Sequence, residues 1–300
     1  MSENSLARDW TTHSERGALP LIKFGAWLAL KLGRKAARVF LYPICLYFLV
    51  SSTHAARSSR QYLTRVLGRR ARVADVFRHY LTFGACVLDR VFLLNEQIEQ
   101  FDIRIYGEEL VNEIQQSGNG CMLFGAHFGS FEVARAFGRR ERNVPISLLM
   151  YEENARKIRA SLAAINPSLA AEVIGLGRLD SLITVADRLN RGHFIGVLAD
   201  RNVDGKDLVR YDFLGAPAAF PQGPFRVAQL LRRPVILMIG IYRGGRTYEI
   251  FFEPLAEASV ARPREAGTWI DETMRRYVAR LEHYCHAAPF NWFNFYDFWA

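Results

Sequence analysis

From residue 101 onward, short apolar runs alternate with segments whose apolar residues recur every three or four positions. The runs predict strands at 101–106, 120–126, 144–150, 194–199, 234–242 and 247–253. The periodic segments predict helices at 108–116, 130–139, 153–164, 180–191, 224–232 and 267–286. Such alternation favours a layered α/β domain, and Gly244-Gly245 between the last two strands predicts an antiparallel hairpin. We therefore expect one mixed, largely parallel sheet flanked by helices.

The net charge of +9 is concentrated in one quarter of the chain. Residues 1–72 hold 13 Lys and Arg against 3 Asp and Glu, whereas residues 73–300 hold 26 against 27. A near-neutral body argues against a nucleic-acid-binding surface. A basic segment instead suits anionic lipid, so we expect a membrane-associating arm at 1–72 and a catalytic α/β domain at 73–300.

Two apolar stretches, 19–32 and 39–56, lie in this basic quarter, and 59–98 reads as helical. The second stretch has no charged residue, but Pro43 interrupts it, and its strongly apolar part is shorter than the about 20 residues of a spanning helix. It predicts a tilted or re-entrant anchor, or else a pair of buried core helices. Basic residues flank the second stretch at positions suited to lipid phosphates, namely Arg34, Lys35, Arg38, Arg57, Arg60 and Arg65.

The four cysteines are widely spaced and form no Cys-x-x-Cys pair. We interpret Cys45, Cys86, Cys121 and Cys285 as reduced, mostly buried thiols rather than as disulfides or metal ligands. No His-Glu-x-x-His pattern accompanies the histidines, so we expect neither a metal nor another cofactor.

The strongest chemical signal is the segment 125–132, where His127 precedes Glu132 by five positions. A buried strand is expected before it and a helix after it. If Ser130 caps that helix, Glu132 falls in its first turn, where the helix dipole favours a carboxylate that can reach back to the imidazole. The pair then resembles a general base and its orienting acid. Gly125 and Gly129 would let a ligand approach the backbone closely.

Ser130 offers a second reading, as a nucleophile beside His127. The Gly-x-Ser-x-Gly elbow of serine hydrolases is absent, however, and a serine that opens a helix is more often a cap. Isolated histidines such as His79 and His193 are interpreted as structural.

Several charged residues qualify as substrate-binding candidates. Asp200-Arg201 ends the strand at 194–199, and ligands of open α/β sheets bind outside the carboxyl ends of strands, so this pair could converge with His127 or form a turn ion pair. Arg156 and Arg159 share one expected helix and could bind phosphate or face solvent. Arg226 lies early in another helix, where anions bind.

The stretch 289–300 is unusually rich in aromatic residues. So many rings would be a liability if exposed, which predicts an acyl-chain groove, an interfacial belt, or ordinary packing of this segment.

Taken in order, these landmarks resemble the bacterial lipid A late acyltransferase family, of the lauroyl and myristoyl type, within the lysophospholipid acyltransferase superfamily. The His-x4-Glu spacing of His127 and Glu132 resembles the superfamily's His-x4-Asp/Glu signature. It is preceded by an apolar basic N-terminal region and by the sequence at 105–110, and is followed by those at 198–201, 213–217 and 226–228.

The resemblance implies an enzyme on the cytoplasmic face of the inner membrane. It would move a fatty acyl chain from acyl carrier protein, or from coenzyme A, to a hydroxyl of a glycolipid such as a lipid A precursor. By position, His127 would be the general base and Glu132 its partner. Asp200 and an arginine of the 156–159 helix would be further functional residues.

Two departures bear on the acceptor. The aromatic segment carries Asn and Asp where the family pattern has Arg, and Leu214 replaces an expected aromatic residue. The segment resembles divergent members from biosynthetic clusters for polyene-type lipids. The alternatives are therefore an acyltransferase with another lipid or polyene-type acceptor, and a membrane lipid-binding protein without catalysis.

Overall fold

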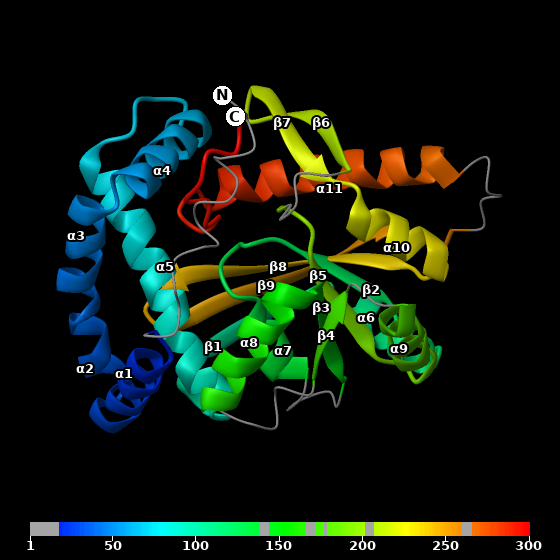
Figure 1. Ribbon diagram of the computed structural model, residues 1–300, viewed down its shortest axis with the longest axis horizontal. Helices are drawn as coiled ribbons and strands as arrows, with labels where there is room; N and C mark the ends of the chain where they lie inside the picture. The colour runs from blue at the N-terminus through cyan, green and yellow to red at the C-terminus, as the bar shows by residue number, and fades with distance from the viewer. Residues whose placement is uncertain (1–17, 139–143, 166–171, 177–178, 202–206, 260–265) are drawn as a thin grey trace.

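A mixed seven-stranded sheet forms the centre of the protein. The structure, a computed structural model, describes residues 18–138, 144–165, 172–176, 179–201, 207–259 and 266–300. The strand order is β1-β9-β8-β2-β5-β3-β4 (Figure 1). The strands are β1 (Asp102–Tyr106), β2 (Met122–Gly125), β3 (Ile146–Tyr151), β4 (Val173–Leu176), β5 (Phe194–Leu198), β8 (Val235–Gly244) and β9 (Thr247–Ala256).

All neighbours in this sheet are parallel except β8 and β9, which form the hairpin predicted around Gly244-Gly245. The helices of the α/β part are α6 (Glu108–Gln116), α7 (Phe131–Phe137), α8 (Glu152–Ile165), α9 (Leu179–Asn190), α10 (Gly223–Leu231) and α11 (Ala266–Ala287). The predicted fold class, a largely parallel mixed sheet flanked by helices, is confirmed.

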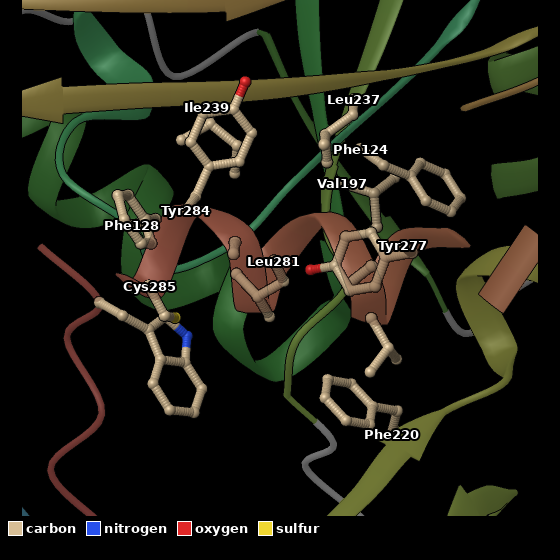
Figure 2. Packing of buried hydrophobic residues seen from close by; sticks show 14 of the residues in the cluster. Phe124, Phe128, Val197, Phe220, Leu237, Ile239, Tyr277, Leu281, Tyr284 and Cys285 are labelled. Atoms are coloured by element: carbon tan, nitrogen blue, oxygen red, sulfur yellow. The ribbon is translucent and has the colours of Figure 1, made fainter. Parts of the chain in front are cut away.

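The two faces of the sheet bury separate hydrophobic clusters. Met122 and Phe124 of β2 point to one face and Leu123 to the other, as the two-residue period of a strand requires. On the first face α11 inserts Tyr277 and Leu281 between the strands and Phe220 (Figure 2). The second face is covered mainly by α5 (Val73–Leu94), α6 and α7. Both faces are therefore buried, which explains why the central strands read as continuous apolar runs.

Among the described residues, four helices precede α5 and lie along one side of the molecule, with α5 between them and the sheet (Figure 1). They are α1 (Ala18–Leu32), α2 (Arg34–Val39), α3 (Leu41–Ser51) and α4 (Thr53–Val66). In the described part of the chain, no single helix has the length and hydrophobicity to cross a bilayer. The stretches Arg34–Ser51 and Thr53–Val66, bent by 97° at their junction, meet that criterion only as a pair.

Large apolar side chains are nonetheless exposed on these helices. Tyr47 and Val50 of α3 are 66% and 72% exposed, whereas Cys45 on the same helix is buried against the body. We call this set the apolar surface: Phe24, Trp27, Leu32, Val39, Phe40, Tyr42, Ile44, Leu46, Tyr47, Phe48 and Val50. Its extent argues against the alternative of a pair of buried core helices for 19–32 and 39–56.

Arg34 and Arg38, expected to face lipid phosphates, instead attach α2 to the body. Arg34 forms a bidentate pair with the buried carboxylate of Asp89, at 2.7 Å for both bonds, and donates to the carbonyl oxygen of Gly245. Arg38 donates to the hydroxyl of Tyr242 and to the same carbonyl. Arg65 stacks on the ring of Trp299. Three of the six flanking basic residues are thus used within the fold, whereas Lys35, Arg57 and Arg60 are exposed.

Three features were not predicted. The strand β4 was missed. A separate hairpin of β6 (Leu208–Phe213) and β7 (Ala216–Pro221) packs over α11, and its turn places Leu214 and Gly215 at positive φ. The expected helical stretch 59–98 is broken between α4 and α5, and α5 ends at Leu94, before a separate 3₁₀ turn at Ile98–Gln100.

Candidate active site

His127 and Asp200 meet at one edge of the sheet. β2 and β5 are parallel neighbours, so the loops that follow Gly125 and Leu198 leave the sheet side by side. The backbone N–H of Ala199 donates to the carbonyl of Gly125 at 3.0 Å and holds the two loops together. The Nδ1 of His127 then lies 2.8 Å from Oδ1 of Asp200. The predicted convergence of these two strand ends is confirmed.

Asp200 is fully buried and receives three hydrogen bonds. Its Oδ1 accepts from Nδ1 of His127, and its Oδ2 accepts from the backbone N–H of His127 at 3.0 Å and from Nε1 of Trp292 at 3.0 Å. Burial alone would raise the pKa of Asp200. The nearby His127 and Arg201 outweigh it and lower the pKa to about 2. The side chain of Asp200 is therefore an ionised carboxylate whose two oxygens accept all three hydrogen bonds.

The hydrogen bond to Asp200 fixes the tautomer of His127. A carboxylate can only accept, so Nδ1 carries the proton and Nε2 of the neutral ring keeps a lone pair. Nε2 makes no hydrogen bond to the described residues, and 34% of the side chain is exposed. Burial and the charge of Arg201 lower the pKa of His127, although Asp200 acts in the opposite direction. The ring can thus serve as a base at neutral pH.

Two glycines let the His127 loop lie against β8. Gly129 has φ +50°, and a side chain there would overlap the carbonyl oxygen of Gly240. A Cβ on Gly240 would in turn stand 2.5 Å from the carbonyl oxygen of Ser130. The close approach allows the backbone N–H of Ser130 to donate to Gly240 at 3.1 Å. The sequence predicted that Gly129 lets a ligand approach the backbone. In the structure, the absence of a side chain at Gly129 instead lets β8 pack closely against the loop.

Glu132 occupies the first turn of α7, as expected, but the carboxylate bonded to His127 is that of Asp200. The Oε1 of Glu132 lies 3.3 Å from Nε of Arg135, which is fully buried, and its Oε2 lies 3.6 Å from Nε of Arg90. Arg135 also pairs with Glu172 at 3.2 Å. The expectation that Glu132 reaches back to the imidazole is corrected: its carboxylate balances a buried arginine. Its requirement for turnover stays a prediction.

The other candidate residues have separate surroundings. Ser130 is the N-cap residue of α7, but its hydroxyl makes no capping bond. Arg201 donates to the carbonyl of Phe293 and stacks on Tyr296, beside His127. Arg156 is exposed on α8.

Arg159 and Arg226 are engaged locally, with no contact to His127 or Asp200. Arg159 donates to the carbonyl of Val173 at 3.2 Å and pairs with Glu152 at 3.3 Å. Arg226, on α10, donates to Gln222 and pairs with Asp207 at 3.3 Å. Of the four candidate arginines, Arg201 is the one that lies beside the imidazole of His127.

The aromatic segment, residues 289–300, packs into the protein beside His127. Trp292 is 1% exposed and supplies the N–H that Asp200 accepts. Its carbonyl accepts from Nε2 of His79 at 2.9 Å, while Nδ1 of His79 accepts from the hydroxyl of Ser59. Burial lowers the pKa of His79 to about 4, so this histidine is neutral. Sequence reasoning missed both contacts, and the density of aromatic residues was their only signal.

The described residues contain no group of three or more His, Cys, Asp or Glu side chains placed to hold a metal ion. The four cysteines are free and buried, and burial raises the pKa of Cys121 and Cys285. The catalytic candidates are therefore the imidazole and its carboxylate rather than a thiolate.

Residues 13–300 match the family of bacterial lipid A biosynthesis acyltransferases. The chain belongs to this family. The match covers nearly the whole chain and includes His127, Asp200 and the aromatic segment, so membership implies acyltransferase activity in lipid A biosynthesis. It also implies an acyl donor and a lipid acceptor, and this bacterial family is membrane-associated. A search among proteins of curated function finds no match.

Proposed function

We propose that this acyltransferase moves a fatty acyl chain from a carrier thioester to a hydroxyl of a membrane glycolipid, with His127 as the general base. The observation that carries the proposal is the 2.8 Å contact between Nδ1 of His127 and buried Asp200, which leaves Nε2 as the acceptor at the carboxyl edge of the sheet. Acyl carrier protein is the proposed donor, with coenzyme A as the alternative, and a lipid A precursor is the proposed acceptor.

The proposed reaction is a direct transfer. Nε2 of His127 removes the proton of the acceptor hydroxyl as its oxygen attacks the thioester carbonyl. The tetrahedral intermediate then expels the thiolate, which takes the proton back from the imidazolium, so that one ester forms and one thioester breaks. Asp200 stabilises the imidazolium in between, as the acid of a catalytic triad does. The transfer needs no cofactor.

The anionic parts of the substrates require positive partners. Arg201 raises the positive potential beside the imidazole, as its effect on the pKa of His127 indicates. Arg156, Arg159 and Arg226 lie on the surfaces of α8 and α10, and we assign them to the acidic carrier or to acceptor phosphates.

The apolar surface suits attachment to the cytoplasmic side of the inner membrane. Its rings and aliphatic side chains would enter the acyl region, while Lys35, Arg57 and Arg60 remain exposed for anionic headgroups. Arg34 and Arg38 bind the body, so α2 would hold the catalytic domain at a fixed position relative to the bilayer.

Charged residues on α3 should weaken membrane binding. We expect Tyr47→Asp with Val50→Asp to lower binding to vesicles by more than about tenfold, since each apolar side chain contributes roughly 1.5–3 kcal/mol when buried. The protein would be synthesised cell-free with phosphatidylethanolamine–phosphatidylglycerol vesicles and followed by flotation. Ile183→Asp with Leu230→Asp is the matched control, because those residues are equally exposed on α9 and α10. Equal flotation of both variants would argue against α3 as the attachment site.

The reaction itself is tested with purified protein, acyl carrier protein loaded with several chains, and a membrane lipid extract. The expected result is a lipid product heavier by one acyl group, together with free carrier thiol. Intact-mass analysis of the protein distinguishes the alternative mechanism, because a nucleophilic Ser130 would accumulate an acyl adduct. A protein that binds lipid without forming product would exclude the proposed function.

A further inference from the structure

The aromatic segment shares backbone hydrogen bonds with the loop that carries His127. The N–H of Gly129 donates to the carbonyl of Asn291, and the N–H of Phe293 donates to the carbonyl of His127, both at 2.7 Å. Between them, Phe128 and Trp292 form an antiparallel bridge. The loop is therefore held as a short β-ladder against a partner more than 160 positions away in the sequence.

The same segment is fixed from its other side. The side chain of Asn291 bonds both backbone groups of Tyr242 in β8, at 2.8 and 3.2 Å. His79 donates to the carbonyl of Trp292, and Arg201 donates to that of Phe293. His79 is fully buried and its ring is neutral, so Nε2 donates to the carbonyl of Trp292 while Nδ1 accepts from the hydroxyl of Ser59. The position of Trp292 is thus set by β8, α5 and the loop after β5 together.

We propose that Trp292 is a positioning residue of the active site, whose indole N–H holds the carboxylate of Asp200 in the orientation that receives the Nδ1–H of His127. The inference rests on the proposed role of His127 as the base. Trp292 is buried and acts through Asp200 rather than by contact with substrate.

Geometry supports a role beyond packing. Oδ2 of Asp200 is shared by two donors, the indole N–H and the backbone N–H of His127. Together they fix the plane of the carboxylate and leave Oδ1 for the imidazole. Without the indole N–H the carboxylate can rotate, and the ring loses its fixed orientation. A displacement of about 1 Å at a reacting group can cost about 10²-fold in rate.

The test replaces Trp292 by benzothienylalanine, introduced site-specifically. This residue keeps the bicyclic shape of tryptophan but puts sulfur in place of the N–H. Trp292→Phe is the second, simpler variant. Trp299 is the matched control, because its indole in the same segment donates at 3.2 Å to the carbonyl of Phe213 instead. We expect the change at 292 to lower kcat by about 10- to 100-fold with an unchanged KM for the donor. The change at 299 should stay within twofold of the wild type.

A second readout does not depend on turnover. The rate at which diethyl pyrocarbonate modifies His127, followed by peptide mass against pH, reports the pKa of its ring. Asp200 raises the pKa of His127, and a carboxylate that can rotate away from Nδ1 stabilises the imidazolium less, so the half-modification pH should fall for the 292 variants and not for the 299 variants. The charged groups acting on His127 are Asp200 and Arg201, and both are present in every variant.

The two readouts separate the two proposals. A wild-type protein that transfers no acyl group but shows the expected shift in His127 modification would contradict the proposed function and leave the positioning role supported. Unchanged kcat and unchanged modification in the benzothienylalanine-292 protein would overturn the role of Trp292, whatever the activity of the wild type.

Discussion

Replacing His127 by alanine is expected to lower kcat for acyl transfer by about 10²–10⁴-fold, because the hydroxyl then loses its general base. The side chain is 34% exposed, and Asp200 keeps the two donors at its Oδ2, so thermal stability should change little. His127→Gln is the companion variant, since its amide can still donate toward Asp200 but cannot remove a proton. Initial rates of carrier-thiol release, with product identified by mass, give the measurement.

The outcome also discriminates against a lipid-binding protein without catalysis. Such a protein would float with vesicles and bind acceptor lipid equally well with or without His127. If His127→Ala and His127→Gln both retained more than a tenth of wild-type turnover, His127 could not be the base.

Asp200→Asn is expected to lower kcat by about 10³–10⁴-fold, similar to the loss when the acid of a catalytic triad becomes an amide. The reason is geometric. Asp200 accepts at both oxygens, and an asparagine must turn its NH₂ toward one set of donors. If its oxygen keeps the two donors at Oδ2, the NH₂ faces Nδ1 of His127. The imidazole must then carry its proton on Nε2, where the base is needed.

Glu132→Gln is the matched control for Asp200→Asn. It removes a carboxylate that pairs with buried Arg135, so it should lower the thermal midpoint by several degrees through an uncompensated charge. It should leave the orientation of the imidazole intact, and its kcat should fall less than that of Asp200→Asn when both are assayed well below their unfolding temperatures. If kcat fell more in Glu132→Gln than in Asp200→Asn, Glu132 rather than Asp200 would be the residue that orients the imidazole.

The sheet was predictable because buried parallel strands are visible as apolar runs, and the convergence of His127 with Asp200 followed from both residues ending such runs. The identity of the imidazole's partner was not. A spacing of five positions makes Glu132 look available, but the first turn of α7 directs its carboxylate to Arg90 and Arg135. Asp200 lies 73 positions away, and only the pairing of β2 with β5 brings it near.

The remaining surprises also depend on long-range contacts. The sequence places Arg34 and Arg38 where lipid-facing residues are expected. In the structure, both guanidinium groups donate to the carbonyl oxygen of Gly245 in the turn of the β8–β9 hairpin. The β6–β7 hairpin was missed because its turn places Leu214, a residue that rarely adopts positive φ, beside Gly215. The density of aromatic residues predicted an acyl-chain groove, an interfacial belt or ordinary packing for the aromatic segment. It did not predict the pairing with the His127 loop, because the acceptor of the Trp292 indole lies 92 positions away in the sequence.

The pH dependence of kcat/KM tests the central claim, that a neutral His127 held by Asp200 is the base, most directly. The profile reports the free enzyme's essential base. The pKa of His127 is lowered from its ordinary value of 6.5, so protonation of the ring should inactivate the enzyme only below pH 6.5. The prediction is a plateau at neutral pH and a single decline below pH 6.5, absent from the residual activity of His127→Gln. A base inflection above pH 8, or the same acidic decline in His127→Gln, would contradict it.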